Sequence, residues 1–166
     1  LFEGRLAELL TKIPSAPVAV VALVFDDLPQ VPEAFGFLIP RDQGLRILGT
    51  LYDSSIFPGR APEGRRLFRV LVGGRRDPEA VDLSDTALLD LVLRDLENAW
   101  GPFPPPRSHG IFRHSLGIAQ YEIGHQALVE EIHAACPPEL SLIGSSYHGV
   151  ALNACIDEAR QLDPSR

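Results

Sequence analysis

The spacing of apolar residues along the chain predicts its longest helix. Within residues 84–100, leucine and valine recur at intervals of three and four, which places them on one helical face: Leu88, Leu91, Val92 and Leu96. Ser84 is a favourable N-cap for this helix, and Asp85 in the first turn suits the positive end of its dipole. The charged residues that we expect to lie away from the apolar face are Asp90, Arg94, Asp95 and Glu97.

Two other segments have the same period. Residues 3–13 place four apolar side chains on one face before Pro14 ends the helix, namely Leu6, Leu9, Leu10 and Ile13. Residues 124–136 predict a second amphipathic helix, which Pro137 and Pro138 end. A last helix is expected after the turn that begins at Gly144.

Short apolar runs bounded by loop residues predict the strands. We expect them at 16–25, 35–40, 45–52, 65–74 and 108–118, with a last one just before Gly144. The connection RDQG is short enough for a hairpin, so consecutive strands there should be antiparallel. The predicted fold is therefore α+β, with helices packed on a largely antiparallel or mixed sheet.

Composition narrows the class of protein. The 166 residues are 45% hydrophobic and 22% charged, which is typical of a soluble globular domain with a core. A net charge of -7 argues against a nucleic-acid partner, because binding phosphates needs a clustered basic face. The arginine pairs at 65–66 and 75–76 are expected to be solvated. The longest apolar run, residues 16–25, is too short to span a bilayer and lacks signal-peptide flanks, so we expect a cytoplasmic location.

Candidate catalytic and metal-binding groups are sparse. The chain has five histidines, but His125 and His133 are eight residues apart on a helix, too far to share one ion, so we expect no metal site. Ser145 and Ser146 lack the G-x-S-x-G elbow of a serine hydrolase. The two cysteines, Cys136 and Cys155, are expected to be buried free thiols. We therefore assign no catalytic residue.

One turn has a physical reason to bind a ligand. In LSLIGSSYHGVALNACIDEAR, residues 140–160, small residues separate an apolar run from a helix. Such a turn exposes backbone N–H groups and the positive end of a helix dipole, and both favour an electron-rich oxygen. Many α/β proteins use the same residues in a turn that binds nothing, so both interpretations stay open on this pattern alone.

Five stretches in order change the interpretation. FGFLIP, ILGTLYDSSIFPGRAP, LVGGRR, GIAQYEIGH and LIGSSYHGVALNACIDEAR together resemble the C-terminal third of oxygen-dependent protoporphyrinogen oxidases. That family includes the bacterial coproporphyrinogen-oxidising enzymes and belongs to the flavin amine oxidases. The resemblance implies oxidation of a porphyrinogen of heme biosynthesis by FAD, with oxygen reoxidising the flavin. It does not choose between protoporphyrinogen and coproporphyrinogen.

The resemblance also implies site residues. Val150, Ala151 and Leu152 match a segment whose backbone faces the flavin, and Gly144 and Ser145 lie on the preceding turn. Positions that match a tetrapyrrole cavity are Phe35, Leu38, Leu71 and Gly73. Plain core packing is the alternative role for these apolar residues. His114 and Ala119 depart from the tryptophan and proline frequent in relatives, which puts the details of the flavin environment in doubt.

The same resemblance predicts the organisation of a longer parent. Residues 1–137 would belong to its substrate-binding domain, and 138–166 would be a strand and helix of its FAD-binding domain. The G-x-G-x-x-G fingerprint is absent, and the chain starts at Leu1 and has no methionine, so we expect a fragment whose partner is the N-terminal FAD-binding part. Such a fragment should be inactive alone, and peripheral membrane association of the parent stays open. The alternatives are a non-catalytic binding or assembly module and another amine oxidase relative, such as a carotenoid desaturase.

Overall fold

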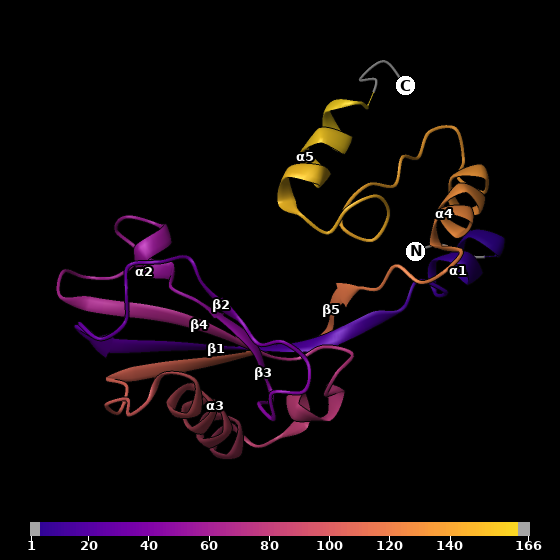
Figure 1. Ribbon diagram of the computed structural model, residues 1–166. Helices are drawn as coiled ribbons and strands as arrows, with labels where there is room; N and C mark the ends of the chain where they lie inside the picture. The colour runs from indigo at the N-terminus through magenta and orange to yellow at the C-terminus, as the bar shows by residue number, and fades with distance from the viewer. Residues whose placement is uncertain (1–3, 163–166) are drawn as a thin grey trace. The chain divides into compact units, whose positions relative to one another are not determined.

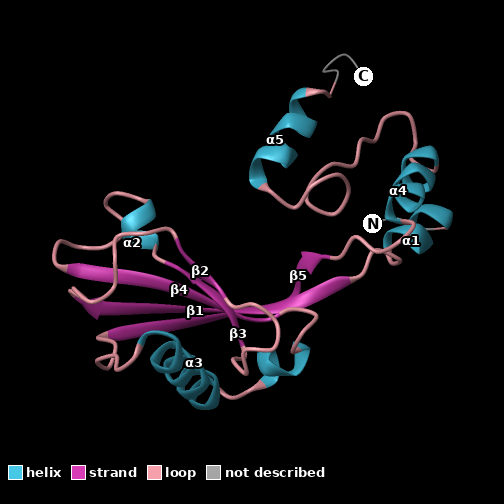
Figure 2. Ribbon diagram, viewed as in Figure 1, coloured by secondary structure: helices cyan, strands magenta, loops and turns pink. Residues whose placement is uncertain are grey.

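The computed structural model describes residues 4–162 and confirms the predicted α+β class (Figure 1). A sheet of five strands has the order β2-β3-β4-β1-β5. Its strands are β1 (Ser15–Asp26), β2 (Gly36–Leu38), β3 (Ile47–Leu51), β4 (Arg65–Gly73) and β5 (Ser108–Ala119). The pairs β1 with β4, β2 with β3, and β3 with β4 are antiparallel, and the pair β2 with β3 confirms the hairpin predicted at RDQG. Figure 2 distinguishes these strands from the helices.

The chain divides into two compact units. One is Pro17–Gly117, which contains most of the sheet, and the other joins Leu1–Ala16 to Ile118–Arg166. Each unit has its own cluster of buried apolar side chains. The predicted division of the parent at residue 137 concerns a longer protein and stays a prediction.

In the sheet unit, helix α3 (Asp85–Trp100) covers one face of the sheet (Figure 1). Residues paired across antiparallel strands point to the same side. The row Phe37, Thr50, Val70 and Val21 faces the core, where Val21 and Val70 are fully buried. The next row consists of Leu38, Gly49, Leu71 and Val20, and it faces the opposite side of the sheet from α3.

The prediction for α3 is confirmed for its apolar face and its cap. Leu88, Leu91, Val92 and Leu96 are all buried, and the Ser84 hydroxyl accepts a hydrogen bond from the backbone N–H of Ala87. The prediction for Asp95 is wrong, because its side chain is buried. One oxygen, Oδ2, accepts backbone hydrogen bonds from Arg46 at 2.6 Å and Ile47 at 3.0 Å, at the start of β3. The carboxylate thus accepts from two consecutive backbone N–H groups where the chain enters β3.

Two short helices were absent from the sequence prediction. Helix α2 (Asp53–Ile56) follows β3 directly, and the 3-10 helix η1 (Pro78–Asp82) precedes α3. In α2 the Ser54 hydroxyl accepts a hydrogen bond from the backbone N–H of Leu67 at 3.1 Å, which ties this helix to β4. Helix α2 lies at the start of DSSIFPGRAPEG, a stretch rich in Pro, Gly, Asp and Ser, which are typical of loops.

The second unit contains α1 (Arg5–Leu10), α4 (His125–Ala134) and α5 (Leu152–Arg160). Leu6 and Leu9 of α1 pack with Ile132 of α4, as the apolar periodicity predicts. The strand predicted just before Gly144 is wrong, because residues 140–143 form no strand. An apolar run becomes a strand only where another strand offers N–H and C=O partners, and the described part of this unit offers none beside it. The predicted helix after it is present as α5.

No helix within residues 4–162 combines the length and the apolar character needed to cross a membrane.

Candidate functional site

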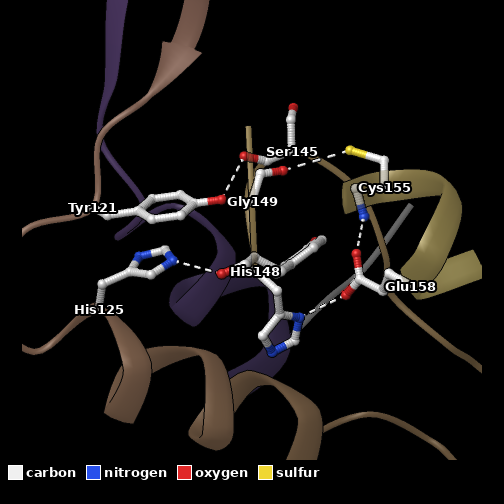
Figure 3. A network of polar contacts seen from close by, with 9 residues as sticks. Tyr121, His125, Ser145, His148, Gly149, Cys155 and Glu158 are labelled. Carbon is white, nitrogen blue, oxygen red and sulfur yellow. Dashed lines mark hydrogen bonds and ion pairs between the residues drawn. The ribbon is translucent and has the colours of Figure 1, made fainter. Parts of the chain in front are cut away.

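The turn at residues 144–149 is fixed by one carboxylate of helix α5 (Figure 3). Glu158 accepts a hydrogen bond from the backbone N–H of Gly144 through Oε2 at 2.9 Å. Its other oxygen, Oε1, lies 2.6 Å from Nδ1 of His148. The beginning and the end of the turn therefore meet the same side chain, and Glu158 was not among the residues predicted from the sequence.

Burial and hydrogen bonding act on Glu158 in opposite directions. Burial alone would raise the pKa of this carboxyl, because it disfavours the charged form. The N–H of Gly144 and the ring of His148 outweigh that effect and hold the pKa below the ordinary value of a glutamate. Glu158 is therefore ionised at neutral pH and available to both partners.

Two aromatic side chains fix the middle of the turn. The Tyr121 hydroxyl donates to the carbonyl oxygen of Ser145 at 2.9 Å, and Nε2 of His125 lies 2.8 Å from the carbonyl oxygen of Tyr147 (Figure 3). The rings of Tyr121 and His125 stack with 3.9 Å between centroids. Since a carbonyl oxygen only accepts, the contact of His125 requires a proton on Nε2. Burial raises the pKa of Tyr121, so its hydroxyl keeps the proton that it donates.

Gly144 itself has a conformation that suits glycine alone. Its φ is 120°, a region that side chains with a Cβ rarely adopt. Ser145 follows it with an exposed side chain. These two predicted residues are thus held by their backbone, and the side chain of Ser145 remains free of any described hydrogen bond to the turn.

The predicted flavin-facing segment is exposed. Val150 is 55% and Leu152 76% exposed, and Ala151 is exposed between them. Helix α5 begins at Leu152, and its N-cap, Ala151, has no side chain able to accept a hydrogen bond from the first turn. The segment thus presents apolar side chains next to backbone N–H donors, which is the combination that an electron-rich, flat ring system requires.

Two of the four predicted substrate residues share one row of the sheet. Leu38 and Leu71 both pair with Gly49, so they point to the same side of the sheet, away from α3. Leu38 is 81% exposed and Phe35, just before β2, is 69% exposed. Gly73 is buried and has a φ of 103°; a Cβ there would lie 2.7 Å from Val81 and 2.8 Å from the carbonyl oxygen of Pro17. Packing alone therefore explains a glycine at position 73.

The predicted site residues divide between the two units. Gly144, Ser145 and residues 150–152 lie together in one unit, while Phe35, Leu38, Leu71 and Gly73 lie in the other. That both groups line one cavity with a cofactor stays a prediction. The sequence analysis missed Tyr121, His125 and Glu158. Tyr121 and His125 contact residues 24 and 22 positions later in the chain, and Glu158 contacts residues 14 and 10 positions earlier.

The cysteines and the possible metal ligands were also considered from the sequence. Cys136 and Cys155 are free thiols, as predicted, but the prediction that they are buried is wrong, because both are only partly buried. The Sγ of Cys155 lies 3.6 Å from the carbonyl oxygen of Gly149. Across residues 4–162, His, Cys, Asp and Glu side chains form no group of three or more that could hold a metal ion.

Similar proteins were found over nearly the whole chain. Coproporphyrinogen III oxidase of Bacillus subtilis is 32% identical, with 95% of this chain and 36% of the relative covered. Protoporphyrinogen oxidase 1 of spinach (Spinacia oleracea) chloroplasts is 36% identical, with 92% of this chain and 30% of the relative covered. The chain thus spans about a third of the length of these curated relatives.

A solved structure agrees with the sequence matches. A protein from Exiguobacterium sp. 255-15, provisionally assigned as a protoporphyrinogen oxidase, superposes with a TM-score of 0.79 at 27% identity, with 95% of this chain and 36% of that chain covered. The family described as flavin containing amine oxidoreductase matches residues 2–160. With the match running through both units, the chain belongs to the flavin-containing amine oxidoreductase family.

Proposed function

We propose that this chain supplies the substrate-binding face and the C-terminal part of the flavin site of an FAD-dependent porphyrinogen oxidase of heme biosynthesis. The observation that carries the proposal is the match of at least 92% of the chain to relatives named coproporphyrinogen III oxidase and protoporphyrinogen oxidase. The oxidation is that of a porphyrinogen to a porphyrin, with oxygen as the final acceptor. Because relatives of both names match, either porphyrinogen fits the proposal.

The residues present suit a flavin. The turn at 144–149 is fixed from three sides by Glu158, Tyr121 and His125, so its backbone is preorganised before any ligand arrives. Val150 and Leu152 are exposed, and the uncapped first turn of α5 offers N–H donors toward an electron-rich ring edge. FAD, when bound, supplies the redox chemistry.

The remaining tasks belong to side chains of this chain. Val150 and Leu152 would cover a face of the ring and exclude water from it. Ser145 would orient the ring through its backbone N–H, because the backbone groups of Gly144 are already bonded to Glu158 and Tyr147. Phe35, Leu38 and Leu71 would give the macrocycle an apolar wall, with Gly73 at the end of the same strand. Glu158 acts through the turn as a positioning residue, because it contacts Gly144 and His148 and lies in the helix behind them.

A chimera tests the proposal. Residues 1–166 would replace the matched third of the Bacillus subtilis relative, and bound FAD would be measured by absorbance after release. Oxidation of coproporphyrinogen III and protoporphyrinogen IX in air would be followed by porphyrin fluorescence, with the remainder of the relative alone as the control. We expect FAD binding and oxidation by the chimera only. A chimera that binds FAD and oxidises neither porphyrinogen would contradict the proposal.

The chain alone provides a second test. Since half of a flavin site buries little of the ligand, we expect residues 1–166 to purify colourless and to bind added FAD weakly. A yellow preparation with one flavin per chain would contradict the expectation that the FAD-binding part of the parent is needed.

A further inference from the structure

Arg69 lies among apolar residues on the face of the sheet that points away from α3. In the register of β4 it pairs with Ala22 of β1 and Leu51 of β3. Leu67 and Leu71 precede and follow it on the same side of β4. Its side chain is 40% exposed, so a cationic group remains accessible beside these apolar residues.

Asp53 of α2 fixes the guanidinium of Arg69. Its Oδ1 accepts from Nη2 of Arg69 at 2.8 Å, and the Asp53 side chain is only 11% exposed. A guanidinium has five N–H donors, and this bond uses one of them. The Nε of Arg69 is buried and has no hydrogen-bond partner among the described residues. Arg69 is thus held in place by Asp53, and the exposed part of its guanidinium keeps N–H donors that a second acceptor can reach.

We propose that Arg69 binds a carboxylate on the rim of the macrocycle and so gives this site its preference for carboxylated tetrapyrroles. The inference rests on the proposed function. Residues two apart on a strand are about 7 Å apart, so a ring that contacts Leu71 has its carboxylate arms within reach of Arg69. Arginine and carboxylate match in planar, two-pronged geometry.

Binding of coproporphyrin III, a fluorescent tetrapyrrole with carboxylate arms, tests the assignment on the 166-residue chain itself. Replacing Arg69 alone would leave the charge of Asp53 unpaired, which could repel the ligand or unfold the site. The test variant is therefore the double substitution Asp53→Asn with Arg69→Gln, which keeps the pair neutral overall. Arg94→Gln is the control, since Arg94 is exposed on α3 over the opposite face of the sheet. Thermal unfolding by circular dichroism verifies that each variant is folded.

The double variant should bind coproporphyrin III about tenfold more weakly, as expected for the loss of one charge-assisted bond. Arg94→Gln and Asp53→Asn alone should bind as the parent chain does or more tightly. Binding of the methyl-esterified porphyrin should be equal in the parent chain and the double variant. Equal binding of the free acid by the parent chain and the double variant, or no binding by the parent chain, would overturn the proposal.

The chimera separates this inference from the proposed function. In it, Arg69→Lys should raise KM for coproporphyrinogen III and leave kcat near the parent value, because the bond is made in the ground state as in the transition state. If the chimera is active and Arg69→Lys leaves its KM unchanged, the carboxylate site is refuted and the oxidase function is not. If the chimera is inactive but the 166-residue chain binds coproporphyrin III through Arg69, the oxidase function is refuted and the carboxylate site is not.

Discussion

Replacing Asp95 by alanine should destabilise the sheet unit more than the loss of one surface charge. The substitution removes the single oxygen that accepts the backbone N–H groups of Arg46 and Ile47 at 2.6 and 3.0 Å. A buried donor without a partner costs about 1–3 kcal/mol. Alanine regains up to about 0.7 kcal/mol of helix propensity. The Ile47 N–H is buried and incurs this cost in full, whereas the Arg46 N–H is only partly buried and incurs less. The expected loss of unfolding free energy is therefore about 2–4 kcal/mol.

Urea unfolding followed by Trp100 fluorescence measures this loss. Trp100 is the only tryptophan of the chain and ends α3, so its fluorescence reports on the sheet unit that contains Asp95. With a slope of roughly 2 kcal/mol per molar urea, the midpoint should fall by about 1–2 M. Asp90→Ala, an exposed change on the same helix, is the matched control. Asp95→Asn should lose only about 1 kcal/mol, because an amide oxygen can still accept both bonds without the added strength of a charge. Equal midpoints for the alanine variants at positions 95 and 90 would refute the reasoning.

Three other predictions concern the turn, a glycine and the exposed segment. The pKa of Glu158 lies below its ordinary value, so the stability that its carboxylate contributes to the fold is present above the unfolded pKa of about 4.3. That stability is lost as pH falls through the folded pKa. Glu158→Gln should remove this sensitivity to acid, as measured by NMR on the amide of Gly144. Gly73→Ala adds a clash to a positive φ and should cost about 1–3 kcal/mol more in urea unfolding than Gly59→Ala, where φ is 78° and nothing lies within 4 Å of the new Cβ. Leu152→Ala should change stability by less than about 0.5 kcal/mol, yet reduce the FAD content of the chimera; unchanged FAD content would argue against a flavin contact.

The pattern of apolar residues was sufficient for the sheet and the long helix, because those elements are determined by which side chains must leave water. It failed for Asp95, since a charged residue on the edge of an apolar face can be buried if the chain elsewhere supplies N–H donors. Those donors begin β3, nearly 50 residues earlier in the sequence. The strand predicted before Gly144 failed for a related reason, because a strand requires a partner that its own residues do not encode.

The candidate site shows the same division. Glycine and serine in the turn, and apolar residues after it, could be recognised from their own sequence. The side chains that fix the turn could not, since Tyr121 and Glu158 meet it only through the folding of a whole unit. The pairing of Arg69 with Asp53 could not be predicted either, because it depends on α2, which follows β3, lying next to β4.

Glu158 makes the order of the turn depend on a helix that buries none of its residues. Helices of that kind open locally at a free-energy cost far below that of global unfolding. Each opening of α5 that moves Glu158 also releases the N–H of Gly144 and the ring of His148. Hydrogen exchange at Gly144 should therefore follow that of the α5 amides, and a ligand that orders the turn should slow the exchange of both. A ligand bound at this turn would thus also stabilise the last helix of the chain against local opening.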